Sequence, residues 1–97
     1  NKTNVSLKRT DWKSFNAGGS VRTIDLSKDG KYIYAALNTS SELAVIDYQS
    51  FKLIEKFKIA NYPVGLAVSP DDKYIAVTQQ GKSGNGGNHV DIFTRNN

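Results

Sequence analysis

The sequence predicts an all-β fold in which a four-stranded antiparallel sheet repeats along the chain. Three observations support this prediction. Residues 24–33 and 66–75 share one pattern at an offset of 42 residues, which places Ser27 against Ser69. Short runs of β-branched and aromatic residues lie between turn-forming residues. No stripe of apolar residues at helical spacing continues across these turns.

Four strands are expected in the first repeat, each rich in β-branched or aromatic residues. They cover residues 22–26, 31–37, 43–47 and 52–59. A tight turn at residues 27–30 joins the first two, because Asp29 accepts local backbone hydrogen bonds and Gly30 permits a positive φ. Each strand is therefore bounded by residues that reverse the chain.

The second repeat has the matching turn at residues 69–72, where Pro70 presets the backbone at the second position. Asp72 stands where the first repeat has Gly30, an exchange that Asp tolerates at modest cost. Two strands are expected within residues 63–78, and a third runs from His89 to Thr94. Four antiparallel strands in a repeat of about 40 residues are typical of a β-propeller blade.

The repeat divides the 97 residues into about two blades. With strands lettered a to d from the central channel outward, the chain reads d, then abcd, then abc. Residues 1–17 are expected to be the outer strand of a neighbouring blade. Residues 18–60 form a complete blade, and residues 61–97 form a blade without its outer strand.

Two blades cannot close a ring, since propellers use about four to eight. Further blades are therefore the expected partners. They come either from the rest of a longer chain or from identical copies that assemble in a closed ring. Alone, the unit would expose strand edges and apolar blade faces, which favour association.

Composition narrows the function classes. The formal net charge is +4, but Lys52, Lys56 and Lys58 lie beside Glu55 on an outer strand, where charge keeps an edge soluble. Nucleic acid is therefore not an expected partner. The absence of cysteine excludes disulfides and thiolate metal sites. The apolar runs are too short to span a membrane, and no signal peptide is visible.

Three segments resemble the YVTN family, the lactonase-like seven-bladed propellers. They are residues 69–78 (SPDDKYIAVT), 44–47 (AVID) and 62–65 (YPVG). The resemblance covers residues 21–78 well and the first 17 residues weakly. It implies a propeller scaffold in a bacterial secreted or periplasmic setting. A lactonase-like enzyme would need an acid–base or metal centre, and these two blades alone supply neither that nor a Gly-x-Ser-x-Gly motif.

One rim of the blades collects the loops between strands d and a and between strands b and c. The longest is residues 79–88, five residues longer than its counterpart, because Leu43 and Val90 lie 47 positions apart. Its glycines let backbone N–H groups approach an anion or a carbohydrate hydroxyl, and Lys82 adds charge. A solvated flexible hairpin loop explains the same residues. The loop lacks the glycine spacing of a Walker motif.

Three further residues on or near this rim carry ionisable groups. His89 and Asp91 lie on the same side of a strand. A metal site there would need ligands from another blade, so no metal site is expected, and a solvated histidine is the ordinary interpretation. Arg22 begins an innermost strand, where it can face the channel mouth and hold a carboxylate with two N–H groups. Otherwise it pairs with a neighbouring acid.

The leading hypothesis is a non-enzymatic propeller module that binds a protein, a glycan or a small molecule on this rim. The candidate ligand-binding residues are Arg22, Asn38, Asn61, Tyr62, Gln79, Lys82, Asn88 and His89. No catalytic residue, metal or cofactor is assigned. The alternative hypothesis is a lactonase-like or other hydrolytic enzyme whose active site needs the complete ring.

Overall fold

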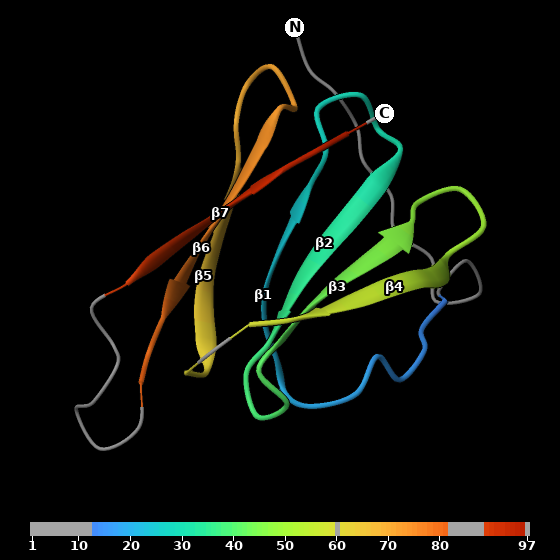
Figure 1. Ribbon diagram of the computed structural model, residues 1–97. Coiled ribbons are helices and arrows are strands. Elements are labelled where there is room, and N and C mark those ends of the chain that lie inside the picture. The colour runs from blue at the N-terminus through green and yellow to red at the C-terminus, as the bar shows by residue number, and fades with distance from the viewer. Residues whose placement is uncertain (1–12, 60, 82–88, 97) are drawn as a thin grey trace, which may run out of the picture.

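The computed structural model describes residues 13–59, 61–81 and 89–96, in which there are seven strands and no helix (Figure 1). The strands are β1 (Val21–Leu26), β2 (Tyr32–Leu37), β3 (Glu42–Asp47), β4 (Lys52–Lys58), β5 (Pro63–Val68), β6 (Tyr74–Gln79) and β7 (Val90–Thr94). They form a first sheet, in the order β1-β2-β3-β4, and a second sheet, in the order β5-β6-β7. Every pairing is antiparallel, which confirms the predicted all-β fold of propeller blades.

The strands in the middle of the first sheet are apolar on both faces. In β2, Tyr32 and Tyr34 face the second sheet, and Ile33, Ala35 and Leu37 face the opposite way. Alternate residues of a strand point to opposite faces, so this pattern requires cover on both sides of the sheet. The first sheet is therefore built to lie between two neighbours.

The predicted turns are present in both repeats. The Gly30 N–H donates to the Ser27 carbonyl at 3.1 Å, and the Asp72 N–H donates to the Ser69 carbonyl at 3.0 Å. Gly30 has φ +77° and Asp72 has φ +64°, so both close the turn in the left-handed region. The same backbone geometry thus repeats at the expected 42-residue offset.

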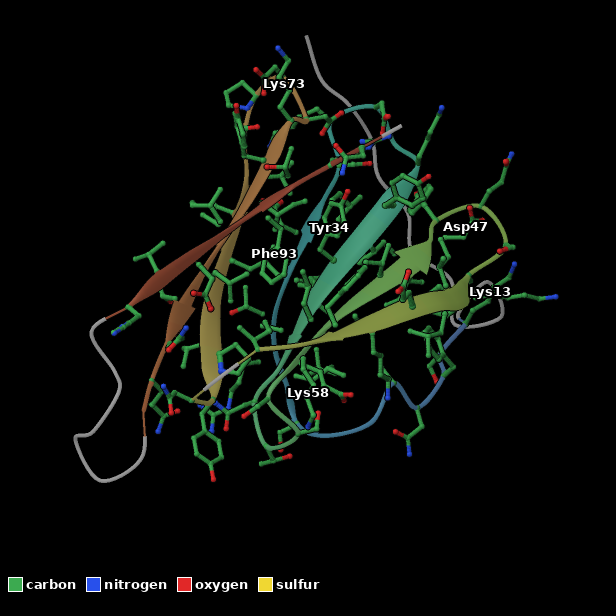
Figure 2. All side chains as sticks on the ribbon, viewed as in Figure 1. Lys13, Tyr34, Asp47, Lys58, Lys73 and Phe93 are labelled. Atoms are coloured by element: carbon green, nitrogen blue, oxygen red, sulfur yellow. The ribbon has the colours of Figure 1, made fainter. Side chains whose placement is uncertain are left out.

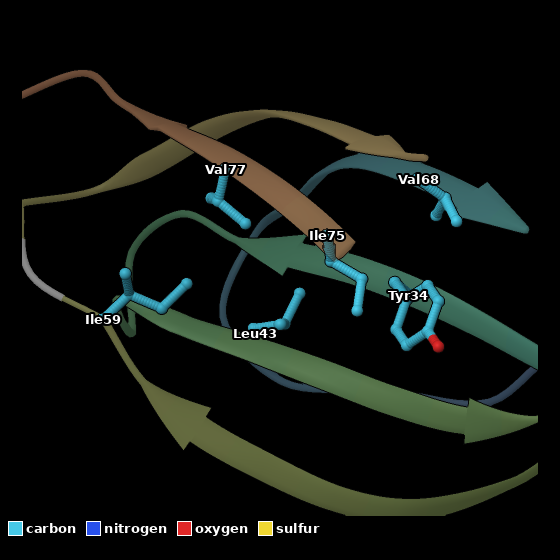
Figure 3. Close-up of a cluster of buried hydrophobic side chains, with 6 residues drawn as sticks. All are labelled: Tyr34, Leu43, Ile59, Val68, Ile75 and Val77. Carbon is cyan, nitrogen blue, oxygen red and sulfur yellow. The ribbon is translucent and has the colours of Figure 1, made fainter. Parts of the chain in front are cut away.

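The main core lies between the two sheets (Figure 3). Its buried members are Tyr34, Leu43, Ile59, Val68, Ile75 and Val77. Burying one such aliphatic or aromatic side chain stabilises a fold by about 1.5–3 kcal/mol. The inner strands β1 and β5 are joined by Asp25, whose carboxylate accepts the N–H groups of Leu26 and Val68, each at 2.9 Å.

A second apolar cluster lies on the far face of the first sheet. Its buried members are Ala17, Ala35, Leu37, Ala44 and Ile46. Ala17 stands 42 positions before Ile59, which is buried against the second sheet in the main core. Phe15 meets Phe51 edge-on, with ring centroids 4.8 Å apart. Residues 13–17 therefore pack against the far face of the first sheet. They do so in the same way as the segment around Ile59 packs against the second sheet.

The predicted outer strand at residues 1–17 falls mostly outside the described residues. Residues 13–17 are described and are not in a strand.

The outward face of the second sheet is apolar and uncovered within the described residues. Tyr74, Val90 and Ile92 are 46%, 60% and 58% exposed. Tyr74 and Ile92, with Ala67, Val68, Ser69 and Ala76, line an open groove of about 420 Å³. Tyr74 corresponds to Tyr32 in the first repeat, and Ile92 corresponds to Val45. Tyr32 and Val45 pack between the two sheets, so this outward face repeats the face of the first sheet that the second sheet covers.

Candidate functional site

The loop that follows β2 and the first two residues of the loop that follows β6 meet Asn61 and Tyr62 at one end of both sheets (Figure 1). Asn38 and Gln80 lie at corresponding positions of these loops. The Asn38 side-chain amide donates to the Gln80 side-chain oxygen and to the Pro63 carbonyl, each at 3.1 Å. Asn38 is only 4% exposed. The structure therefore places this candidate residue inside the rim, where it joins the two sheets.

Gln79 is also buried, with 7% exposure, and lies in a chain of polar side chains. Its amide oxygen accepts the Asn61 side-chain N–H at 3.3 Å, and its amide nitrogen donates to the Asp91 carboxylate. Asn61, Gln79 and Asp91 come from the β4–β5 connection, β6 and β7. Asn61 is the exposed end of this chain and can meet a ligand directly.

The β4–β5 connection has an unusual backbone. Asn61 and Tyr62 have φ +60° and +59°. Residues other than glycine are uncommon in this left-handed region. The Tyr62 N–H donates to the Ser41 hydroxyl at 3.2 Å, and the Tyr62 carbonyl accepts the Gln80 N–H at 2.8 Å. These bonds hold the connection against the loops on both sides, so Asn61 and Tyr62 sit on a fixed platform.

Arg22 lies at a β-bulge near the start of β1, since the register with β2 shifts between Val21 and Thr23. A bulge re-aims the side chain of the extra residue. Arg22 is exposed and makes no salt bridge within the described residues. Its guanidinium is therefore available on the inner strand at this end of the sheet.

The remaining predicted ligand-binding residues are His89, Lys82 and Asn88. His89 is exposed, and its carbonyl accepts the Gln79 N–H at 3.3 Å. Lys82 and Asn88 lie outside the described residues.

Across residues 13–59, 61–81 and 89–96, no group of three or more His, Asp or Glu side chains could hold a metal ion. Nor does any helix in this part of the chain have the length and apolarity to cross a membrane.

The opposite rim holds a charged cluster that the sequence analysis missed. The Asp72 carboxylate accepts the N–H groups of Lys28 at 2.7 Å and Asp29 at 2.9 Å, one to each oxygen. The Arg95 guanidinium donates to the Asp29 carboxylate at 2.6 Å and lies 3.6 Å from the Asp72 carboxylate. It also lies over the Tyr32 ring, 4.8 Å from its centroid. The available signal in the sequence was Asp72 itself, which stands where the first repeat has Gly30.

A cleft of about 390 Å³ opens between the two sheets on the side of β4 and β7. Tyr34 and Phe93 project into the space between the sheets (Figure 2). Phe57 meets Phe93 across it, with centroids 6.3 Å apart. Burial raises the pKa of the Tyr34 phenol, so this group stays neutral. The cleft is an aromatic gap between two blades and contains no paired acid and base suited to hydrolysis in the described residues.

Comparison with known proteins agrees with this architecture. Among solved structures, the chain is similar to the Kuenenia stuttgartiensis hydrazine synthase, with 28% sequence identity and a TM-score of 0.66. The similarity covers 73% of this chain and only 19% of that one, so the chain spans about a fifth of the structure it matches. No curated protein matches the sequence.

A family model described as "Lactonase, 7-bladed beta-propeller" matches residues 2–97, almost the whole chain. This match agrees with the two antiparallel sheets, and it confirms the lactonase-like resemblance of the sequence. The chain therefore belongs to the family of lactonase seven-bladed β-propellers.

Proposed function

We propose that this chain is a two-blade part of a larger propeller that binds an acidic ligand on the rim where the β2–β3 connection meets Asn61, Tyr62 and Gln80. The observation that carries the proposal is the position of Arg22. It is exposed on a bulge of an inner strand and has no acidic partner in the described residues. A guanidinium in that position can hold a carboxylate through two N–H groups.

Other groups on the rim support the same interpretation. The Asn61 side chain is exposed at the end of the polar chain through Gln79 to Asp91. Asn38 and Gln80 fix the neighbouring loops by hydrogen bonds between the sheets. A rim whose polar groups are already oriented loses little conformational entropy when it binds a ligand.

Further blades are part of this proposal. The outward face of the second sheet exposes Val90 and Ile92, which correspond to Leu43 and Val45 of the first sheet. Leu43 and Val45 pack between the two sheets. An additional blade that packs in the same way would cover the outward face. It would also extend the rim around the channel.

Binding is tested by calorimetric titration of the assembled protein with citrate and succinate as probes. Arg22→Gln should weaken carboxylate binding at least tenfold, and Arg22→Lys should weaken it less, because the charge remains without the bidentate geometry. Lys28→Gln, on the opposite rim, is the control and should bind as the native protein does. Native-like affinity in Arg22→Gln would overturn the proposal.

Hydrolysis of a lactone by the complete ring is the second candidate function, and the description of the matching family model favours it. The test is an assay of the complete assembly with a panel of lactones. Turnover that disappears in Arg22→Gln would place the rim in an active site. Carboxylate binding without turnover of any lactone would favour the binding module instead.

A further inference from the structure

The charged cluster on the opposite rim depends on residues that are not shared by the two repeats. Asp72 supplies the carboxylate, and Gly30 stands at the corresponding position of the first repeat. Arg95 supplies the guanidinium, and Tyr48 corresponds to it at the 47-residue offset of the third strands. The first sheet therefore has neither group to offer to a blade that precedes it.

The two repeats also differ in the backbone N–H groups that they can donate to such a carboxylate. Lys28 and Asp29 each give one backbone N–H to the Asp72 carboxylate. In the second repeat, Pro70 corresponds to Lys28, and proline has no N–H. The turn of the second sheet therefore cannot receive a carboxylate from a following blade with two N–H groups. Of the two described repeats, the first supplies the pair of N–H donors and the second supplies the acceptor carboxylate, and neither supplies both.

Turn chemistry alone does not account for these residues. Asp72 has φ +64°, where glycine is less strained than aspartate, and the other repeat has glycine there at φ +77°. Pro70 shows that the second position of this turn accepts proline, which lowers the entropy of the unfolded chain. An aspartate at 72 and a non-proline residue at 28 are both less favourable locally, and both are needed for the contact between sheets.

We propose that Asp72 is a pairing determinant, which selects as its neighbour the blade whose first turn presents two N–H groups. The apolar blade faces do not discriminate strongly by themselves. The uncovered outward face around Tyr74 and Ile92 repeats the face that carries Tyr32 and Val45, so a blade has more than one apolar surface to pack against. A wrong neighbour leaves the carboxylate of Asp72 without its donors, and such a lost polar contact is a source of specificity.

Arg95 strengthens this selection. It lies between the carboxylates of Asp29 from the first sheet and Asp72 from the second. The side chains of Arg95 and Asp72 are only 10% and 16% exposed, so the pair is largely shielded from water in this junction. The selected partner thus has an acid at the third position of its turn as well as two N–H groups. This pairing is independent of any ligand on the opposite rim.

The first experiment exchanges residues between the repeats in the full chain. Asp72→Gly and Lys28→Pro each introduce the residue of the other repeat. If only turn chemistry matters, both substitutions raise the urea midpoint of unfolding. Under the proposal both lower it, and the double variant loses less than the sum of the single losses, because both remove the same contact. A raised midpoint in either single variant would overturn the proposal.

Amide hydrogen exchange gives an internal control within one turn. In Asp72→Gly, the amides of Lys28 and Asp29 should exchange at least tenfold faster than in the native chain. The Gly30 amide should change little, because it donates to the Ser27 carbonyl and not to Asp72. Equal acceleration of all three amides would indicate general loosening of the turn and would count against the proposal.

Selection itself is measured by sedimentation velocity at matched concentration. The native chain should give one species, and Asp72→Gly should give several, because its second sheet packs against the sheets of other copies as well as its own. The conservative Arg95→Lys variant keeps a charge between the two carboxylates and should remain close to native. An unchanged distribution in Asp72→Gly would show that Asp72 stabilises the junction without choosing the partner.

Discussion

At the scale of single residues, aspartates organise the turns of this protein. The Asp29 carboxylate accepts the Ser27 hydroxyl at 2.7 Å and the Lys31 N–H at 3.1 Å, and it binds Arg95 from the other sheet. The Arg95 hydrogen bond, followed by that from Ser27, holds the pKa of Asp29 well below its ordinary value. The N–H of Lys73 lowers the pKa of Asp71 in the matching turn. These carboxylates are therefore bound in their ionised form.

This electrostatic arrangement predicts an acid-sensitive fold. The pKa of Asp29 is lower in the folded state than in the unfolded state, where it is near 3.8, so the unfolded chain takes up a proton first as the pH falls. The contribution to stability is complete above that value and is lost as the pH decreases toward the folded pKa. Urea unfolding at a series of pH values should show a midpoint that falls below about pH 4. Asp29→Asn should reduce this dependence, and an identical pH profile would contradict the assignment.

At the scale of elements, irregular pairing at the start of each inner strand shapes the rim. The register shifts near Arg22 in β1 and between Pro63 and Leu66 in β5. Gly65 lies in the second of these irregularities, and its N–H donates to the Thr78 hydroxyl at 2.9 Å. A Cβ atom at this position would lie 2.6 Å from that hydroxyl oxygen. A side chain at this position would therefore collide with the Thr78 hydroxyl.

Gly65→Ala should therefore destabilise the chain. The added methyl group collides with the Thr78 hydroxyl, and overpacking of this kind costs about 1–3 kcal/mol. Thr78→Ala alone removes the hydrogen bond and the exposed γ-methyl group, at a cost of about 1 kcal/mol. The double variant should be more stable than Gly65→Ala, because the clashing oxygen is gone. Urea unfolding of the three variants measures this, and equal stability of Gly65→Ala and the native chain would refute the steric argument.

At the scale of the whole molecule, the two sheets form one junction of a longer series. The first sheet buries apolar residues on both faces, helped on its far face by Phe15 and Ala17. The second sheet buries one face and leaves Val90 and Ile92 exposed on the other. Because the exposed face repeats a covered one, the unit is shaped for addition of further blades.

This architecture predicts that a charge on the outward face blocks association without unfolding the chain. Ile92→Lys changes a residue that is 58% exposed, so the free energy of unfolding should change by no more than about 0.5 kcal/mol. Self-association, measured by sedimentation equilibrium, should be lost. Gln49→Lys adds the same charge on an exposed turn and should associate as the native chain does. Native-like association of Ile92→Lys would remove this face from the contact.

The strands and the turns follow from patterns in the sequence. The 42-residue repeat, the alternation of apolar residues and the residues at Ser27 to Gly30 act over short distances along the chain, so they can be interpreted without a structure. They placed the strands of both sheets close to their observed bounds, and they indicated that further blades complete the fold.

Which polar residues on the rims are buried depends on how the two sheets pack against each other. Asn38 and Gln79 resemble exposed loop residues in the sequence, but hydrogen bonds with Gln80 and Asp91 hold them inside the rim. Nor does the sequence show that Asp72 meets the turn of the first sheet, 43 and 44 positions away. Such contacts depend on the angle and the distance at which two blades pack. Neither quantity can be derived from a local pattern in the sequence.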